Sequence, residues 1–120
     1  MLNNTQKGIE GEEIAVAHLL KQGYEILEKN WRHQHLEIDI IACINSILVI
    51  VEVKLRANDF YGKPEDFVTK SKQKKVIKAA DFYIKENNIF LETRFDVISI
   101  IQNPDELTLE HVEGAFYPML

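Results

Sequence analysis

The fold is decided by the stretch Glu37-Ile38-Asp39-Ile40-Ile41-Ala42-Cys43-Ile44-Asn45-Ser46-Ile47-Leu48-Val49-Ile50-Val51-Glu52-Val53-Lys54. It contains two arms rich in Ile and Val, which are typical of buried β-strands. The polar pair Asn45-Ser46 separates the arms. Asn tolerates the left-handed backbone conformation that a two-residue hairpin turn needs. The sequence therefore predicts a β-hairpin folded about this pair.

The same turn predicts which charged side chains meet. Folding the hairpin about its polar pair places Asp39 opposite Glu52 and Glu37 opposite Lys54. Because side chains alternate along a strand, all four groups share one face. Directly opposed carboxylates destabilise a strand pair, and half-buried carboxylates need a compensating partner. A bound divalent cation would be such a partner.

A purely structural account of the hairpin is equally open. In this account Lys54 pairs with Glu37, and Asp39 and Glu52 lie at the solvent-exposed end of the sheet. Charged side chains on an edge strand are a common protection against aggregation. The register also matters, because a one-residue slip would send half of the charges to the other face.

Length and composition predict a single domain over residues 1–120. The only cysteine, Cys43, excludes an internal disulfide framework and a metal site built from thiolates. No apolar run is long enough to span a bilayer, and the N-terminus lacks the apolar core of a signal peptide. These features predict a cytoplasmic protein without a membrane partner.

A helix is predicted over residues 5–22, with Thr5 as its N-cap and Gly23 as the C′ residue. Glu12 falls in the middle of the apolar stripe, where a carboxylate needs a partner. Taken alone, a cation or a backbone donor at the edge of the helix is the simplest such partner. The stripe itself consists of Ile9, Val16, Leu19 and Leu20.

The remaining pattern predicts an α/β domain with a mixed five-stranded sheet, in the order α-β-β-β-α-β-β. The strand at 94–101 follows a helix, so a right-handed crossover should lay it parallel to the arm at 48–54. Gly62 and Pro64 interrupt regular structure between the hairpin and the second helix. Outside the hairpin, the predicted segments are a strand at 24–32, an irregular stretch at 55–69, a helix at 70–87, and strands at 94–101 and 107–112.

The first half of the second helix carries a cluster of lysines without an acidic residue. Lysines near a helix N-terminus oppose the helix dipole, so a purely structural helix would favour acids there. The net charge of −5 argues against bulk attraction to nucleic acid, so any contact needs a local basic patch. A solvated face is the alternative. The candidate phosphate contacts are Lys70, Lys72, Lys74, Lys75, Lys78 and Arg56.

Asp39, Glu52 and Lys54 meet the needs of metal-assisted phosphodiester cleavage. Carboxylate oxygens suit Mg²⁺, which retains water ligands and also accepts phosphate oxygens. The metal can activate the attacking water, and a neighbouring lysine can offset developing negative charge. Glu-x-Lys on a strand places both groups on one face.

This arrangement resembles the PD-(D/E)XK nuclease superfamily, in which an acidic strand residue precedes Glu-x-Lys on the next strand. More closely, the chain resembles the YraN-like family of bacterial proteins from about Gly8 to Phe116. The matching residues are Gly8, Gly11-Glu12, Ala15, Gly23-Tyr24, Asn30-Trp31-Arg32, Glu37-Ile38-Asp39-Ile40-Ile41-Ala42, Val51-Glu52-Val53-Lys54, Arg56, Gly62, Arg94-Phe95-Asp96-Val97, His111 and Ala115-Phe116.

The resemblance implies a restriction-endonuclease-like fold with Asp39 and Glu52 as metal ligands and Lys54 as a catalytic residue. The Val53 carbonyl is an additional candidate ligand. In archaeal Holliday-junction resolvases of similar layout a glutamate on the first helix also serves the metal, and Glu12 is the matching position here.

Glu37 is assigned a supporting role in catalysis. Two positions depart from the superfamily pattern. Ile38 stands where the superfamily name has proline, and Leu36 stands where many relatives have glycine. The second departure makes the approach to the predicted site bulkier.

The resulting hypothesis is a Mg²⁺- or Mn²⁺-dependent endonuclease that cleaves DNA, including branched or damaged DNA. One alternative is a non-catalytic module on the same fold that binds nucleic acid or protein. Another is an interaction protein that uses the 55–69 stretch. A homodimer is expected only by analogy with enzymes that cut branched DNA.

Overall fold

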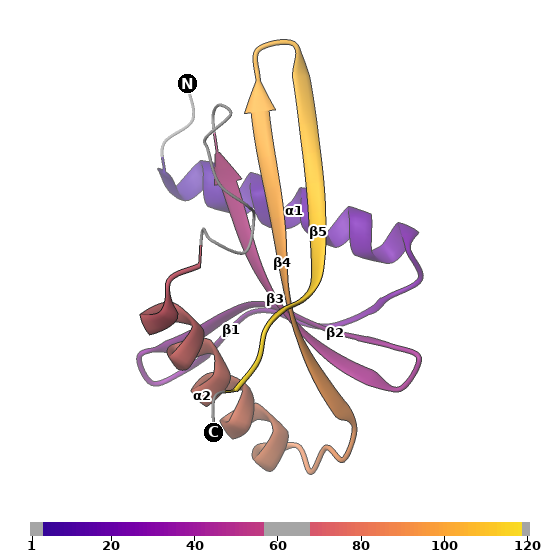
Figure 1. Ribbon diagram of the computed structural model, residues 1–120, viewed down its shortest axis with the longest axis vertical. Coiled ribbons are helices and arrows are strands. Elements are labelled where there is room, and N and C mark those ends of the chain that lie inside the picture. The colour runs from indigo at the N-terminus through magenta and orange to yellow at the C-terminus, as the bar shows by residue number, and fades with distance from the viewer. Residues whose placement is uncertain (1–3, 57–67, 119–120) are drawn as a thin grey trace.

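The computed structural model describes residues 4–56 and 68–118, with the side chains of the first helix described from Glu10 onward. Two helices and one five-stranded sheet make up this part of the chain (Figure 1). The predicted order of elements is confirmed. The elements are α1 (Asn4–Lys21), β1 (Glu25–His33), β2 (Leu36–Ile44), β3 (Ile47–Arg56), α2 (Lys70–Glu86), β4 (Glu92–Asn103) and β5 (Glu106–Phe116).

The sheet is mixed, as predicted, and its strands follow the order β1-β2-β3-β4-β5. β3 and β4 are parallel, and every other neighbouring pair is antiparallel. β4 begins before the predicted strand at 94–101 and ends after it. β5 continues to Phe116, well beyond the predicted end at residue 112, so Gly114 and Ala115 belong to an edge strand.

The central hairpin turns at Asn45 and Ser46, as predicted. Both residues have positive φ angles, 49° and 63°. This is the backbone twist of the mirror-image turns that favour two-residue hairpins. Ile44 then pairs with Ile47, which confirms the predicted register at the turn.

Helix α1 spans Asn4–Lys21, so it starts and ends one residue before the predicted range of 5–22, and Gly23 terminates it as predicted. Gly23 has a φ of +91°, and its N–H donates to the carbonyl of Leu20. The N–H of Tyr24 donates to the carbonyl of Leu19, which completes a Schellman motif. Thr5 was predicted as the N-cap, and that prediction is wrong because the helix already includes Asn4.

The core lies in two layers, one on each face of the sheet. Buried Ala15 and Leu19 of α1 pack on one face, and buried Val76 and Tyr83 of α2 pack on the other. Figure 1 shows α1 crossing behind β4 and β5, whereas α2 lies beside the C-terminal segment. The prediction that Leu20 belongs to the apolar stripe is wrong, because this side chain is 56% exposed.

The connection between β3 and α2 lies mainly outside the described residues, at positions 57–67. Residues 55 and 56 were predicted to belong to the irregular stretch, but they are the last two residues of β3. Thr69 caps α2, because its side chain accepts a hydrogen bond from the N–H of Lys72. None of the helices in the described chain is both long and apolar enough to cross a membrane.

Candidate functional site

The candidate site begins where β2 and β3 stop pairing. The described ladder between them ends at Ile40 and Val51. At the next position the Oδ2 atom of Asp39 accepts a hydrogen bond from the Val53 N–H at 2.8 Å. The Asp39 side chain, and not a backbone carbonyl of β2, therefore accepts the hydrogen bond from the Val53 N–H. In Figure 1, β1 and β2 continue to one side while β3 runs upward beyond this point.

Glu52 lies beside this point on the face of β3 that α2 covers. Its side chain is only 2% exposed. The Oε1 atom is buried and has no hydrogen-bond partner among the described residues, and the Oε2 atom lies 3.9 Å from the Nζ atom of Lys72. A buried carboxylate with an unpaired oxygen is costly unless another group compensates it.

The pKa of Glu52 is raised to about 8, chiefly by burial and also by the nearby charge of Asp39. Lys72 and Lys54 act in the opposite direction. Burial also raises the pKa of Asp39, although the Val53 N–H opposes this shift. The two carboxylates therefore interact electrostatically, with both lysines as their neighbours.

Glu37 is more peripheral than the two buried acids. Its Oε2 atom lies 3.8 Å from the Nη2 atom of Arg32, and its side chain is 39% exposed. Its charge still raises the pKa of both Asp39 and Glu52. Glu37, Asp39 and Lys54 therefore all act electrostatically on Glu52. The predicted pairings of Asp39 with Glu52 and of Glu37 with Lys54 lie beyond the last pair of the described ladder, Ile40 and Val51.

Glu12 approaches this neighbourhood from α1. Its Oε2 atom accepts a hydrogen bond from the Nδ2 atom of Asn30 at 2.6 Å. Burial raises the pKa of Glu12, the bond from Asn30 lowers it, and Asp39 and Glu37 raise it further. The structural partner of Glu12 is therefore a side-chain amide on β1.

The donor set can be compared with the needs of Mg²⁺. Within residues 4–56 and 68–118, no three His, Cys, Asp or Glu side chains are arranged to hold a metal ion. Mg²⁺ is often held by one or two carboxylates, with waters and substrate phosphates completing its shell. Asp39 and Glu52 fit this smaller set in chemistry, because both are oxygen donors and the Oε1 atom of Glu52 has no partner in the part of the chain that the structure describes.

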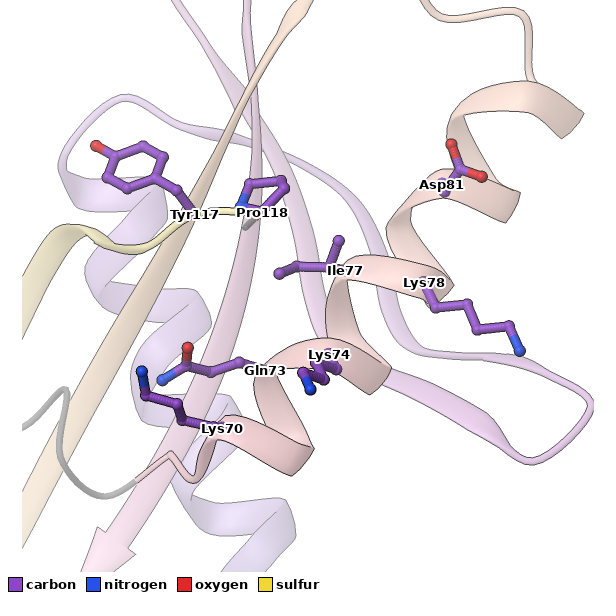
Figure 2. Close-up of a pocket in the computed structure, with 8 residues that line it drawn as sticks. All are labelled: Lys70, Gln73, Lys74, Ile77, Lys78, Asp81, Tyr117 and Pro118. Atoms are coloured by element: carbon purple, nitrogen blue, oxygen red, sulfur yellow. The ribbon is translucent and has the colours of Figure 1, made fainter. Parts of the chain in front are cut away.

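The lysine cluster of α2 is divided among different sides of the helix. Lys72 points to Glu52, so it belongs to the candidate site. Lys70, Lys74 and Lys78 line a pocket next to Tyr117 (Figure 2). The sequence grouped Lys72 with the phosphate contacts, because the position of α2 over β3 cannot be read from lysine spacing. Arg56 lies at the end of β3, and Lys75 is exposed on α2.

A second polar network, on the α1 side of the sheet, was not identified from the sequence as a site. Asp96 is fully buried and accepts hydrogen bonds from Arg94 at 2.9 and 2.8 Å and from the Gly114 N–H at 3.0 Å. Its Oδ2 atom also lies 2.7 Å from Nε2 of His111. Nδ1 of His111 lies 3.1 Å from Nε2 of His18.

Burial alone would raise the pKa of Asp96, but the bonds from His111, Arg94 and Gly114 hold it below its usual value. The signal that could have revealed this network is the Arg-x-Asp spacing on a single strand. That spacing places both side chains on the same face.

The fold and site can now be compared with known proteins. A sequence model described as Uncharacterised protein family UPF0102 matches residues 11–100, a span that includes Asp39, Glu52 and Lys54. The chain belongs to this family. The YraN-like family membership predicted from the sequence is thereby confirmed, while membership of the nuclease superfamily stays a prediction.

Relatives of UPF0102 match almost the full chain. A UPF0102 protein of Flavobacterium psychrophilum is 45% identical over 117 residues, covering 98% of both chains. A relative from Bacteroides thetaiotaomicron is 42% identical over 120 residues, covering 100% of this chain and 99% of its own. One from Parabacteroides distasonis is 42% identical, covering 98% of this chain and 97% of its own. The family therefore extends over both the helices and the whole sheet.

Proposed function

We propose that this protein is a divalent-metal-dependent nuclease that hydrolyses phosphodiester bonds in DNA, with branched or damaged DNA as its leading substrates. The observation that supports this function best is the Glu52 carboxyl group. It is buried near the charge of Asp39, and within residues 4–56 and 68–118 its Oε1 atom has no hydrogen-bond partner. A cation would reduce the repulsion between the two acids and would give the Glu52 Oε1 atom a partner.

Asp39 and Glu52 would hold the metal in this function. Mg²⁺ bound there would supply an activated water and would neutralise charge on the phosphate. Asp39 is already oriented, because the Val53 N–H fixes its Oδ2 atom at 2.8 Å. Such preorganisation lets a site stabilise developing charge without rearranging.

Lys54 and Lys72 would supply the positive charge that faces the scissile phosphate. Lys54 shares the face of Glu52 two residues along β3, and Lys72 approaches from the first turn of α2. Each lysine lowers the pKa of both acids, so each lies within electrostatic reach of the proposed metal position. Lys54 remains the candidate for assisting the attacking water, and Lys72 is the candidate for holding the phosphate.

Cleavage assays test the proposed chemistry. Duplex, flapped and four-way-junction DNA would be incubated with Mg²⁺ or Mn²⁺ and purified wild-type protein. We expect Asp39→Asn, Glu52→Gln and Lys54→Met each to lower the cleavage rate by roughly 100-fold or more, because each removes charge from the reacting centre. The matched control is Glu86→Gln, which neutralises an exposed acid at the end of α2. Cleavage that survives unchanged in all three site variants would refute the proposal.

Metal binding is measured separately from cleavage. Titration calorimetry with Mn²⁺ should give one binding event in the wild type and none in a protein with both Asp39→Asn and Glu52→Gln. Because burial keeps Glu52 protonated near neutral pH, binding at pH 7 should release a proton to the buffer. Identical heats in buffers of different ionisation enthalpy would contradict this linkage. Metal binding and DNA binding without cleavage would favour the non-catalytic module.

A further inference from the structure

A pocket of about 620 Å³ lies between α2 and the segment that follows β5 (Figure 2). One part of its lining is apolar and is formed by Ile77, Tyr117 and Pro118. Figure 2 shows Ile77 on the side of the helix that faces Pro118, whereas the Tyr117 ring points away from the helix. This lining offers a flat aromatic ring and aliphatic carbon next to an open space.

Tyr117 is 61% exposed and follows β5 directly. Its hydroxyl end lies against Gly114, where an added Cβ would overlap with the Tyr117 Oη atom. Gly114 also has a φ of +61°, a conformation that residues with side chains rarely adopt. The N–H of Gly114 is bound to the buried Asp96. The Gly114 backbone therefore lies next to the Tyr117 ring at one edge of the pocket.

The charged part of the lining is basic. Lys70, Lys74 and Lys78 recur every four residues and therefore share one side of α2. The acidic residue of the lining, Asp81, is paired with Lys85, whose Nζ atom lies 2.9 Å from its Oδ2 atom. The lining therefore carries an excess of positive charge, although the whole chain has a net charge of −5. This combination fits an anionic ligand that also has a flat apolar portion.

We propose that this pocket binds an unpaired nucleotide of a DNA strand, with its base against Tyr117 and its phosphates on the lysines. Bases stack on aromatic side chains in sequence-tolerant binding of single strands, and lysines follow the backbone phosphates. A base inside a duplex is stacked between its neighbours, so the pocket selects DNA with a single-stranded portion. This inference rests on the proposed function and specifies its substrate class.

The pocket also lies suitably near the candidate site. Lys72 faces Glu52, whereas Lys70 and Lys74, two positions away on either side, face the pocket. Residues two apart on a helix point in nearly opposite directions, so the two sites are separated by roughly one helix diameter, ~10 Å. A strand that passes the beginning of α2 can contact both.

Fluorescence anisotropy with a short labelled oligothymidylate tests the pocket in EDTA, where no cleavage occurs. We expect Tyr117→Ala to weaken binding of the single strand roughly tenfold. Tyr117→Phe should bind as wild type does, because it retains the aromatic ring. Affinity for a blunt duplex should change less than twofold in Tyr117→Ala. Equal affinity of Tyr117→Ala and wild type for the single strand would overturn the proposal.

A matched pair of lysine variants tests the charged lining. Lys74→Ala should weaken binding of the single strand more than Lys75→Ala, which removes the same charge from the adjacent, exposed position on α2. Equal losses would show attraction to the general charge of the helix and would overturn the pocket assignment. Free thymidine monophosphate should displace the oligonucleotide only at high concentration. Displacement at equimolar concentration would indicate a mononucleotide site instead.

These measurements separate the two proposals. Asp39→Asn and Glu52→Gln should retain the Tyr117-dependent binding in EDTA, because neither residue lines the pocket. A Tyr117 effect on binding without any metal-dependent cleavage would remove the nuclease proposal and leave the pocket. Metal-dependent cleavage without a Tyr117 effect on binding would remove the pocket proposal and leave the nuclease proposal.

Discussion

Glu52 occupies a position where an aliphatic residue would pack well. Val51 before it is fully buried, and its neighbour on β4, Val97, is also fully buried. Keeping a carboxyl group there costs solvation free energy, since Lys72 lies 3.9 Å from Oε2 and no described residue pairs with Oε1. Residues that sacrifice stability in this way cluster at functional sites. The buried and incompletely paired carboxyl group of Glu52 is therefore the main support for the proposed function.

The raised pKa of Glu52 predicts how stability varies with pH in protein free of divalent ions. The folded state holds its proton up to about pH 8, whereas the ordinary value is 4.5, so this contribution is fully present below pH 4.5. It declines as the pH rises and is lost above pH 8. The charged groups around Glu52 are Asp39 and Glu37 on β2, Lys54 on β3 and Lys72 on α2.

Glu52→Gln should remove this dependence, because an amide does not titrate. In urea unfolding with EDTA, the free energy of unfolding of the variant, relative to wild type, should rise by at least about 1 kcal/mol between pH 5 and pH 8. Glu86→Gln, at an exposed position, should change little with pH relative to wild type. A constant difference between Glu52→Gln and wild type would refute the raised pKa.

At the scale of the elements, turn and cap residues determine where the strands and helices end. Asn45 and Ser46 adopt positive φ angles at the hairpin, and Gly23 does so after α1. Each of these residues acts through its own backbone and its immediate neighbours. For this reason the hairpin turn and the end of α1 were predictable from local sequence. The faces of α2 were predictable in the same way, since Val76, Ala79, Ala80 and Tyr83 are all buried.

Gly23→Ala tests the end of α1. Its φ of +91° leaves open space around the position where a Cβ would be, so the cost comes from the backbone conformation and not from a clash. We expect a loss of about 1 kcal/mol in the free energy of unfolding, measured with urea. Gly23→Asn should lose less than Gly23→Ala, because Asn tolerates left-handed conformations better. Equal stability of Gly23→Ala and wild type would contradict the Schellman assignment.

At the scale of the whole molecule, buried polar contacts tie distant segments to one another. Asp96 on β4 binds Arg94 on its own strand and His111 on β5, and His111 in turn contacts His18 on α1. The two histidines are 93 positions apart in the chain. Such a network gives the α1 side of the sheet a specific arrangement of α1, β4 and β5.

Asp96→Asn should be strongly destabilising, because it leaves the Arg94 guanidinium, only 19% exposed, without its buried anionic partner and with only the exposed Glu113 at 3.7 Å. We expect a loss of roughly 3 kcal/mol or more in urea unfolding at pH 7. The control Asp81→Asn removes an exposed ion pair and should cost less than about 1 kcal/mol. Since the folded pKa of Asp96 is lowered, its contribution is present above its unfolded value of 3.8 and is lost as the pH falls further. Similar losses in the two variants would contradict the role given to the network.

The sequence by itself determined the hairpin, its register at the turn, the order of the elements and the face shared by Glu52 and Lys54 on β3. These features follow from turn chemistry and from the periods of strands and helices, which depend on neighbouring residues. Only the tertiary structure decided that Lys72 reaches Glu52, that Glu12 binds Asn30, and that Lys70 and Lys74 meet Tyr117 at a pocket. Each of these contacts joins elements that a crossover or a sheet brings together. The positions that pack against one another across such a connection are set by the shape of the whole core, which no local spacing encodes.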